Sequence, residues 1–269
     1  MKYKNKIIII TCLIILLFTN NIAGQSRELG LFIGGSLFHG DVGYLNAESS
    51  IIQTKTSFGF KVQRNLNYHF GLNLSANHGE LFADDILSSD IYRVNRGLHF
   101  KSKITEIALI SELNFRPYMS YNTEYNRTPY VFAGVAKYFY NPKAQGPDGN
   151  WYSLRPLNNE GQGSTIYPER EVYKLHGVSI PFGVGYKFNL YEFITLSFSM
   201  SWRITFNDYI DDVSTTYIEQ NKPENQSDNN LTQGFQRGNP YDNDKYGFVG
   251  LSITYSIKDP QKGCTDIVY

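Results

Sequence analysis

The sequence is poor in cysteine: its two cysteines, Cys12 and Cys264, lie near opposite ends of the 269-residue chain. Cys12 falls in an amino-terminal segment that we expect to be removed, which leaves Cys264 alone in the mature protein. An intramolecular disulfide is then excluded. Cys264 is either an incidental thiol or, in an oxidising compartment, a group that pairs with another chain.

Long hydrophobic runs are also scarce. The run Ile7–Phe18 has 12 residues, whereas a transmembrane helix needs about 20, and no later stretch approaches that length. No transmembrane helix is therefore predicted. An excess of charge of one sign is absent too, because 25 Lys and Arg balance 25 Asp and Glu. This balance gives no indication of a nucleic-acid partner.

The amino terminus has the order of features of a secretory signal peptide. Lys2, Lys4 and Lys6 precede the apolar run, and small or polar residues follow it up to Gly24. We expect residues 1–24 to be cleaved off after Gly24. Cys12 lies too early in the run for a lipoprotein cleavage site. The mature chain then has 22 basic and 25 acidic residues.

The clearest pattern in the rest of the chain is strict alternation between Ile194 and Phe206. Every even position in this segment is apolar, and every odd position is Thr, Ser or Arg203. Successive side chains of a strand point to opposite faces, so one face is wholly apolar and the other is polar. The segment has 13 residues, which suits a membrane strand of ~9–11 tilted residues better than the ~5–6 of a globular protein.

Seven further segments fit the same template: Glu28–Phe38, Thr54–Arg64, Tyr68–Glu80, Lys103–Phe115, Pro129–Tyr140, Val178–Phe188 and Lys245–Ile257. In Glu28–Phe38 and Pro129–Tyr140, apolar residues occupy both parities, so the facing of these two strands stays open. Pro181 lies in the middle of Val178–Phe188 and cannot donate a ladder hydrogen bond. We expect a bulge or irregular pairing there.

The connections between these segments differ in length in a regular way. Asn65–Asn67 and Asn189–Glu192 are tight turns, and Arg116–Thr128 is of middling length. The alternate connections are long: His39–Gln53, Leu81–Ser102, Asn141–Tyr173 and Asn207–Asp244. Outer-membrane barrels have short periplasmic turns and long external loops. We therefore predict an all-β, up-and-down barrel of about eight strands over residues 25–257, a periplasmic tail over 258–269, and both termini in the periplasm.

The polar parity places charges of both signs inside the barrel. The predicted lumen charge network consists of Lys61, Glu106, Glu112, Lys187 and Arg203. An eight-stranded barrel is just wide enough for side chains to fill, and buried charges need partners. We expect the two glutamates to meet Lys187 or Arg203 and to plug the lumen. The alternative is a charged filter in a channel.

Signals for catalysis or metal binding are weak. His39, Asp41, His78, Glu80 and His99 fall near the predicted external rim, but no nucleophile, base and orienting group share a recognisable spacing. The carboxylates Asp208, Asp211, Asp212, Asp242 and Asp244 could hold calcium across the barrel mouth, although the EF-hand spacing fails. We expect solvated loop charge, no enzyme, no cofactor and no metal.

The order of motifs along the mature chain resembles the PorG-like outer-membrane barrel family of Bacteroidota. The matching motifs are Glu28-Leu29-Gly30 to Gly40-Asp41, Arg96 to Ser102, Tyr130 to Gly134, Asn141 to Ala144, Leu154 to Leu157, Glu160 to Gly163, Ser179 to Tyr186, Asp208 to Tyr217 and Arg237 to Pro240. This resemblance implies a component of the type IX secretion system, which exports proteins and in some members supports gliding motility. Such components are thought to contact a periplasmic ring formed by a lipoprotein and its partner, and the barrel contacts outer-membrane lipids.

Three functions remain open at this stage. An assembly component would use its periplasmic side, where Tyr118, Tyr121, Tyr125 and Cys264 are the candidate partner contacts. A free-standing adhesive or protective barrel would use its long loops, including Trp151 and residues 217–236. A transporter would need an open lumen, which the interior charges disfavour.

Overall fold

The computed structural model describes residues 26–43, 52–218 and 234–257. The predicted signal peptide, the predicted tail and Cys264 lie outside these residues. Within the described ranges, no helix is long and apolar enough to cross a membrane.

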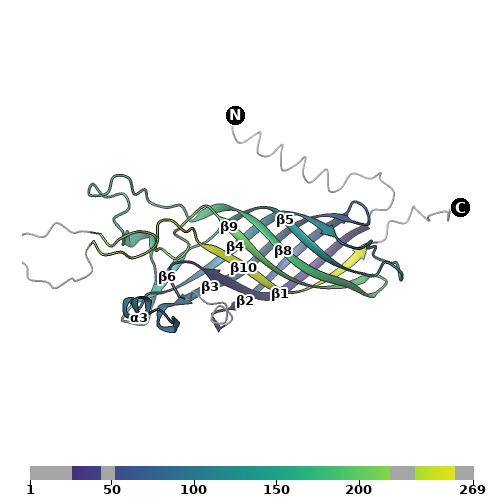
Figure 1. Cartoon of the computed structure of the whole chain (residues 1–269), viewed down its shortest axis with the longest axis horizontal. Coiled ribbons are helices and arrows are strands. Elements are labelled where there is room, and N and C mark those ends of the chain that lie inside the picture. Colours follow the sequence, from purple (N-terminus) through teal and green to yellow (C-terminus); the bar gives the residue numbers. More distant parts are fainter. Residues whose placement is uncertain (1–25, 44–51, 219–233, 258–269) are drawn as a thin grey trace, which may run out of the picture.

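Eight strands of the described chain form a closed antiparallel barrel (Figure 1). They are β1 (Ser26–His39), β2 (Lys55–Asn65), β3 (Phe70–Asp84), β4 (His99–Asn114), β5 (Arg127–Phe139), β8 (His176–Tyr191), β9 (Ile194–Thr205) and β10 (Lys245–Ile257). Each pairs with its neighbour in the chain, and β1 pairs with β10 to close the barrel. The predicted up-and-down barrel of eight strands is confirmed.

Residues facing outward on the wall are mainly apolar, and residues facing inward are mainly polar away from the loop end, the reverse of a soluble protein. Leu31 and Ile33 on β1 are 67% and 66% exposed, whereas the inward Ser57 and Ser179 are fully buried. The lumen side also carries Tyr130, whose ring lies against Gly185, where an added Cβ would come within 2.4 Å of it. This inside-out distribution is the architecture of an outer-membrane barrel.

The structure defines which side chains face the lumen on a strand whose facing the sequence left open. On β1, Glu28 and Phe32 face the lumen while Leu29 and Leu31 face out. At Pro181 no register shift occurs, but the pairing between β5 and β8 is interrupted between Ala133↔Phe182 and Ala136↔Ser179. Irregular pairing rather than a bulge therefore accommodates the missing donor.

The predicted long connection Leu81–Ser102 is too long, because β3 and β4 continue pairing as far as Asp84↔His99. Only Asp85–Leu98 is left as connection, and it forms the 3₁₀ helix η1 (Asp85–Leu87) and the helix α3 (Ile91–Arg96). Asp90 caps the amino terminus of α3, and Gly97 ends it with a φ of 62°. Alternation continues into these strand extensions, but all of their outward residues except Phe82 are polar or charged, so the extensions do not have the pattern of an apolar wall.

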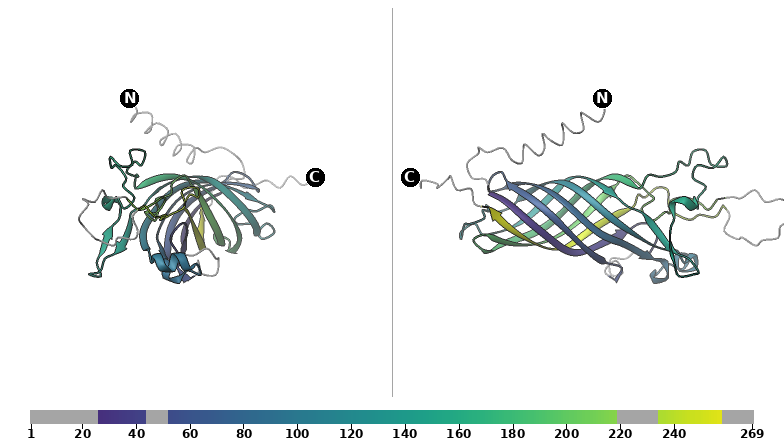
Figure 2. Two further views of the ribbon diagram at one scale, coloured as in Figure 1. Left: turned by 60° about the vertical axis from the view of Figure 1, so that its left-hand side comes forward. Right: turned by 180° about the vertical axis from the view of Figure 1, so that it is seen from behind.

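The barrel has two unlike ends (Figure 2). The turn end carries the starts of β1 and β3, the end of β10 and the short connections. The loop end carries α3, the hairpin of β6 (Pro142–Gln145) and β7 (Trp151–Ser153), and the 3₁₀ helix η2 (Arg155–Leu157). A hydrophobic core fills the barrel at this loop end and includes Phe38, Phe100, Tyr138, Ile210 and Tyr246.

Candidate functional site

Two ion pairs cross the lumen. Arg203 on β9 donates from Nε and Nη2 to the carboxylate of Glu106 on β4, at 2.8 and 2.9 Å. The Tyr246 hydroxyl donates to the same carboxylate at 2.8 Å, and Asn77 donates at 3.2 Å. The Arg203 guanidinium also lies 4.5 Å from the Phe248 ring centroid. Every lone-pair direction of the buried Glu106 thus has a donor, as a buried charge requires.

The second pair lies closer to the turn end. Lys187 on β8 donates to Glu112 on β4 at 3.0 Å. Gln63 and Asn73 donate to the same carboxylate at 2.9 and 3.3 Å. The Lys187 ammonium also lies 4.9 Å from the Tyr130 ring centroid. The structure thus brings four of the five predicted lumen charges into two hydrogen-bonded pairs.

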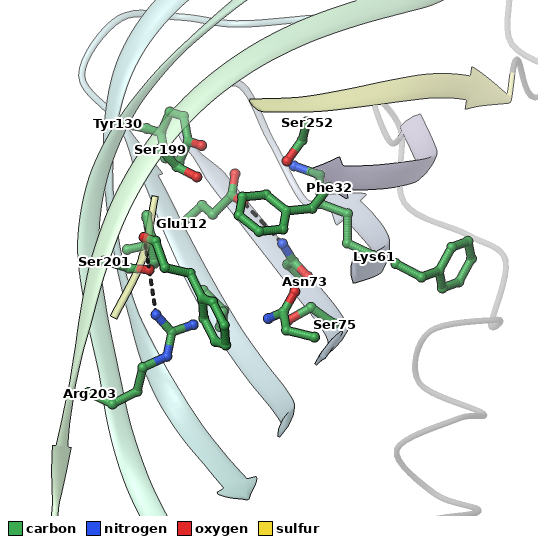
Figure 3. A pocket seen from close by; sticks show the side chains of 15 residues that line it. Phe32, Lys61, Asn73, Ser75, Glu112, Tyr130, Ser199, Ser201, Arg203 and Ser252 are labelled. Carbon is green, nitrogen blue, oxygen red and sulfur yellow. Dashed lines mark hydrogen bonds between the residues drawn. The ribbon is translucent and has the colours of Figure 1, made fainter. Parts of the chain in front are cut away.

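Lys61 is the fifth charge, and it makes no ion pair within the described ranges. It borders a cavity of about 60 Å³ in mid-barrel, which Asn73, Ser75, Ser199 and Ser252 also line (Figure 3). Asn73 Oδ1 and Ser75 Oγ are buried there without a protein partner. A polar cavity of this size has room for a few water molecules that would satisfy these groups. It is too small for a continuous aqueous channel.

Polar side chains also close the turn end. The carboxylate of Glu28 accepts hydrogen bonds from Asn65 at 2.7 Å and from Ser120 at 2.6 Å. The Tyr118 hydroxyl lies 2.7 Å from both Asn189 Oδ1 and Thr195 Oγ1. The β4–β5 connection thus folds back into the barrel mouth. Sequence reasoning missed Glu28 because the parity of its strand was ambiguous.

The burial of Tyr118 corrects one of the predicted partner contacts. Its side chain is 1% exposed, so it cannot present a surface to a partner. Tyr121 and Tyr125 are partly exposed and pack against neighbours in a turn-end aromatic cluster. The ring contacts are Tyr121 with Phe193 at 5.2 Å, Phe193 with Tyr255 at 6.3 Å and Tyr125 with Tyr68 at 5.8 Å.

A buried arginine ties two long connections together at the loop end. Arg237 donates to Glu160 at 3.1 Å and to Asp212 at 3.2 Å, and all three side chains are buried. Glu160 further accepts from the backbone amides of Ser214 and Thr215, both at 2.9 Å. The β5–β8 and β9–β10 connections are thereby joined.

A second arginine joins the other two connections. Arg96 on α3 donates to both carboxylate oxygens of Asp85 at 2.8 and 2.9 Å, and to the backbone carbonyl of Asp41 at 2.7 Å. It also donates to the carbonyl of Arg237. We call the structure built on these two arginines, which joins all four long connections, the loop cap.

Beneath the loop cap lie four carboxyl groups that form no ion pair within the part of the chain described here: Asp41, Asp208, Asp211 and Asp244. Asp211 accepts from the amides of Val42 and Val213 at 3.0 and 2.9 Å, and Asp244 accepts from the amide of Ile210 at 2.7 Å. The expectation of solvated charge is wrong for Asp211, Asp212 and Asp244, which are 1%, 0% and 0% exposed. Asp211 and Asp244 are buried because their carboxylates accept hydrogen bonds from backbone amides of the loops. This role leaves no periodic signal in the sequence.

Burial sets the protonation of these four groups. It raises the pKa of Asp41 to about 6, partly offset by the amide of Asn239. It raises the pKa of Asp208 to about 7, although Ser214 opposes the shift. Burial and the neighbouring carboxylates hold the pKa of Asp211 and Asp244 well above the ordinary value. The group is therefore largely protonated in mildly acidic solution.

Two of the rim histidines contact neighbouring strands and loops. His78 Nδ1 lies 2.8 Å from Thr105 Oγ1, and His99 Nε2 accepts from the amide of Gln145 at 3.0 Å. In residues 26–43, 52–218 and 234–257, no group of three or more His, Cys, Asp or Glu side chains is arranged to hold a metal ion.

The comparisons with known proteins concern both fold and family. No curated protein matches the chain. Ail, the attachment invasion locus protein of Yersinia pestis, is 11% identical, with a TM-score of 0.43 over 87% of this chain and 99% of that one. Neisserial surface protein A is 8% identical, with a TM-score of 0.46 over 87% and 99%. The N-terminal barrel domain of Pseudomonas aeruginosa OprF is 14% identical, with a TM-score of 0.37 over 86% and 97%.

A protein-family model matches residues 6–148. The match covers more than half of the 269 residues. The chain therefore belongs to the family described as Domain of unknown function (DUF6089).

Proposed function

We propose that this protein is a non-enzymatic outer-membrane barrel that serves as a component of the type IX protein secretion system and contacts its periplasmic ring. In this orientation the turn end and both termini face the periplasm, and the loop cap faces outside. The observation that supports an assembly role best is the filled lumen. Two ion pairs, a small cavity and a hydrophobic core occupy it, so surfaces rather than a pore are left to carry the function.

The turn-end aromatic cluster is the surface that we assign to the ring. Tyr68 and Tyr255 are 46% and 55% exposed, and Tyr121, Tyr125 and Phe193 pack beside them. Aromatic residues are enriched at protein interfaces. The same residues also suit the aromatic girdle of a membrane barrel, so the assignment depends on the resemblance in motif order as well as on this surface.

The alternative is a free-standing surface barrel that uses its loops for adhesion or protection. The loop cap favours it, because two arginines with buried side chains join the described parts of the four long connections to one another. A protein that only anchors a periplasmic ring has no evident need for an ordered external platform.

The experiment that separates the two is site-specific photo-crosslinking in intact cells. The full chain carries p-benzoylphenylalanine in place of Tyr125 at the turn end or in place of Tyr241 at the loop end, where Tyr241 is 94% exposed. Captured partners are identified by mass spectrometry after denaturing purification. Capture of the ring lipoprotein or its partner from position 125, but not from position 241, supports the assembly role.

A barrel that captures neither ring protein from position 125 contradicts the assembly role. Capture of host or matrix molecules from position 241 alone would favour the surface barrel. Deletion of the gene with loss of type IX cargo from the medium, restored by the unmodified chain, provides an independent readout of secretion.

A further inference from the structure

The outer wall toward the loop end carries four lysines on neighbouring strands. Lys101 and Lys103 lie on β4, Lys137 on β5 and Lys143 on β6. Positions 101, 103 and 137 have the parity of the outward wall residues Ile107 and Val135, which are 53% and 58% exposed. None of the four makes an ion pair within the described ranges. We call these four residues the lysine patch.

Two of these lysines face each other directly. Lys101 on β4 is the register partner of Lys143 on β6, and residues directly opposite in an antiparallel pair point to the same face. Like charges in this position repel and weaken the pairing of the strands. An anion between or beside the two ammonium groups would relieve this repulsion.

An aromatic ring packs against one lysine of the patch. The Trp151 ring on β7 lies 3.7 Å from Lys101 Nζ, which fixes the position of that ammonium group by a cation–π contact. His99 packs edge-on against the same ring, with centroids 5.9 Å apart. The β6–β7 hairpin therefore holds one lysine and one indole in place beside β4.

The patch is continuous with the lipid-facing wall. Lys137 is the register partner of both Ile107 and Val178, so its backbone lies at the level of apolar wall. Its ammonium group lies 5.4 Å from the ring of Phe139, two residues further toward the loop end. The side chain thus leans out of the apolar belt, as a lysine does where hydrocarbon meets headgroups.

The nearby acidic groups of the described residues form no ion pair with the patch. Glu80 on β3 is the register partner of Lys103, but the two are not within ion-pair distance. Asp148, in the β6–β7 turn, accepts hydrogen bonds from Tyr152 and Asn150 at 2.6 and 2.7 Å. On the opposite wall, by contrast, Lys245 pairs with Asp242 at 2.9 Å. The lysines on β4, β5 and β6 differ in this respect from Lys245.

We propose that the lysine patch binds the phosphate-bearing headgroup of a lipid in the outer leaflet. Lysine ammonium groups bind phosphate as point charges, and anionic headgroups attract clusters of basic residues at the membrane surface. The lipid chains would lie along Ile107, Val135 and Val178. The site rests on the orientation proposed above, with loops outside, but not on the secretion role.

The test uses the full-length barrel in detergent, with lipid A, a bisphosphorylated glycolipid, as the probe. Retained lipid is counted by native mass spectrometry for the natural chain, the double variant K101Q/K143Q and the control R116Q/K245Q, which removes the same charge elsewhere. We expect at least a tenfold weaker retention for K101Q/K143Q and an unchanged retention for the control. Heat-modifiable gel mobility verifies that each barrel is folded.

Equal retention by all three chains, or an equal loss in both double variants, would overturn the proposal. Inorganic phosphate and dephosphorylated lipid A give two further outcomes. Displacement of lipid A by millimolar phosphate alone would assign the patch to free phosphate instead of a lipid. Retention of dephosphorylated lipid A as strongly as lipid A itself would show that the lysines do not bind the phosphate groups. A failure of the photo-crosslinking at position 125 leaves this result unaffected.

Discussion

Glu106 and Arg203 are 97 residues apart in the sequence and lie on strands that are not neighbours, yet they form a two-pronged ion pair across the barrel lumen. β4 and β9 are separated by β5 and β8 in the sheet. The pair therefore exists only because the sheet closes, and it links opposite walls at mid-height. Its removal is a direct test of how much the lumen contributes to the stability of the barrel.

The variant Arg203→Ala should destabilise the barrel by about 3–5 kcal/mol, because it leaves the Glu106 carboxylate buried without its cation. Urea unfolding in lipid vesicles, followed by tryptophan fluorescence, measures the free energy of unfolding. The double variant E106L/R203M removes both charges and should recover most of the loss. A loss below 1 kcal/mol for Arg203→Ala would contradict a structural role for the pair.

The variant Phe198→Arg tests the facing of the wall. Phe198 is 51% exposed on the apolar side of β9, and an outward arginine in mid-membrane costs about 2–4 kcal/mol. Folding yield into lipid vesicles should fall accordingly. Tyr241→Arg, at a loop position that is 94% exposed, is the matched control and should fold like the natural chain. Equal yields for both variants would show that position 198 does not face lipid.

The variant Arg237→Ala should loosen the loop cap and leave the barrel intact. The substitution leaves the buried carboxylates of Glu160 and Asp212 without their cationic partner. Loss of one partner of a buried ion pair costs about 3–5 kcal/mol. Limited proteolysis should then cut the loops while heat-modifiable gel mobility stays unchanged. Lys245→Ala removes an exposed pair worth at most about 1 kcal/mol. Loops that resist protease in both variants would refute the proposed role of Arg237.

The loop cap should be more stable at pH 5 than at pH 8. The pKa of Asp41 is raised to about 6 and that of Asp208 to about 7 in the folded chain. A group whose folded pKa lies above its unfolded value contributes stability that is complete below the unfolded pKa, near 4, and is lost as pH rises through the folded pKa. The loss should therefore occur between about pH 4 and pH 8.

Hydrogen exchange of the amides in residues 207–216, corrected for the intrinsic pH dependence of exchange, measures this effect. Protection of these backbone amides should fall as pH rises. Asp208→Asn should weaken this pH dependence, because the asparagine side chain cannot ionise. Asp242→Asn, at an exposed position paired with Lys245, should leave the profile of the natural chain. Protection that rises with pH would mean that the carboxyl groups have cationic partners in solution.

The wall was predictable because its signal is local. In β9 each residue's facing follows from parity alone, and Ile194 through Thr205 alternate without exception. Parity alone does not find the start of β4, which is His99 rather than the predicted Lys103. The outward residues of this extension are polar or charged, so they do not resemble an apolar wall. β1 carries apolar residues on both parities because Phe32 and Phe38 face a hydrophobic core inside the barrel.

The sequence by itself determined the strand positions, the facing of most strands, and the presence of charges of both signs inside the barrel, because a period of two is set by neighbouring residues in the chain. Only the tertiary structure decided which charges meet. Glu112 meets Lys187 across 75 residues, and Arg237 meets Glu160 across 77. Such pairs depend on barrel closure and on the path of irregular loops. Burial of Asp211 and Asp244 beneath the loop cap follows from that path, and no local pattern encodes it.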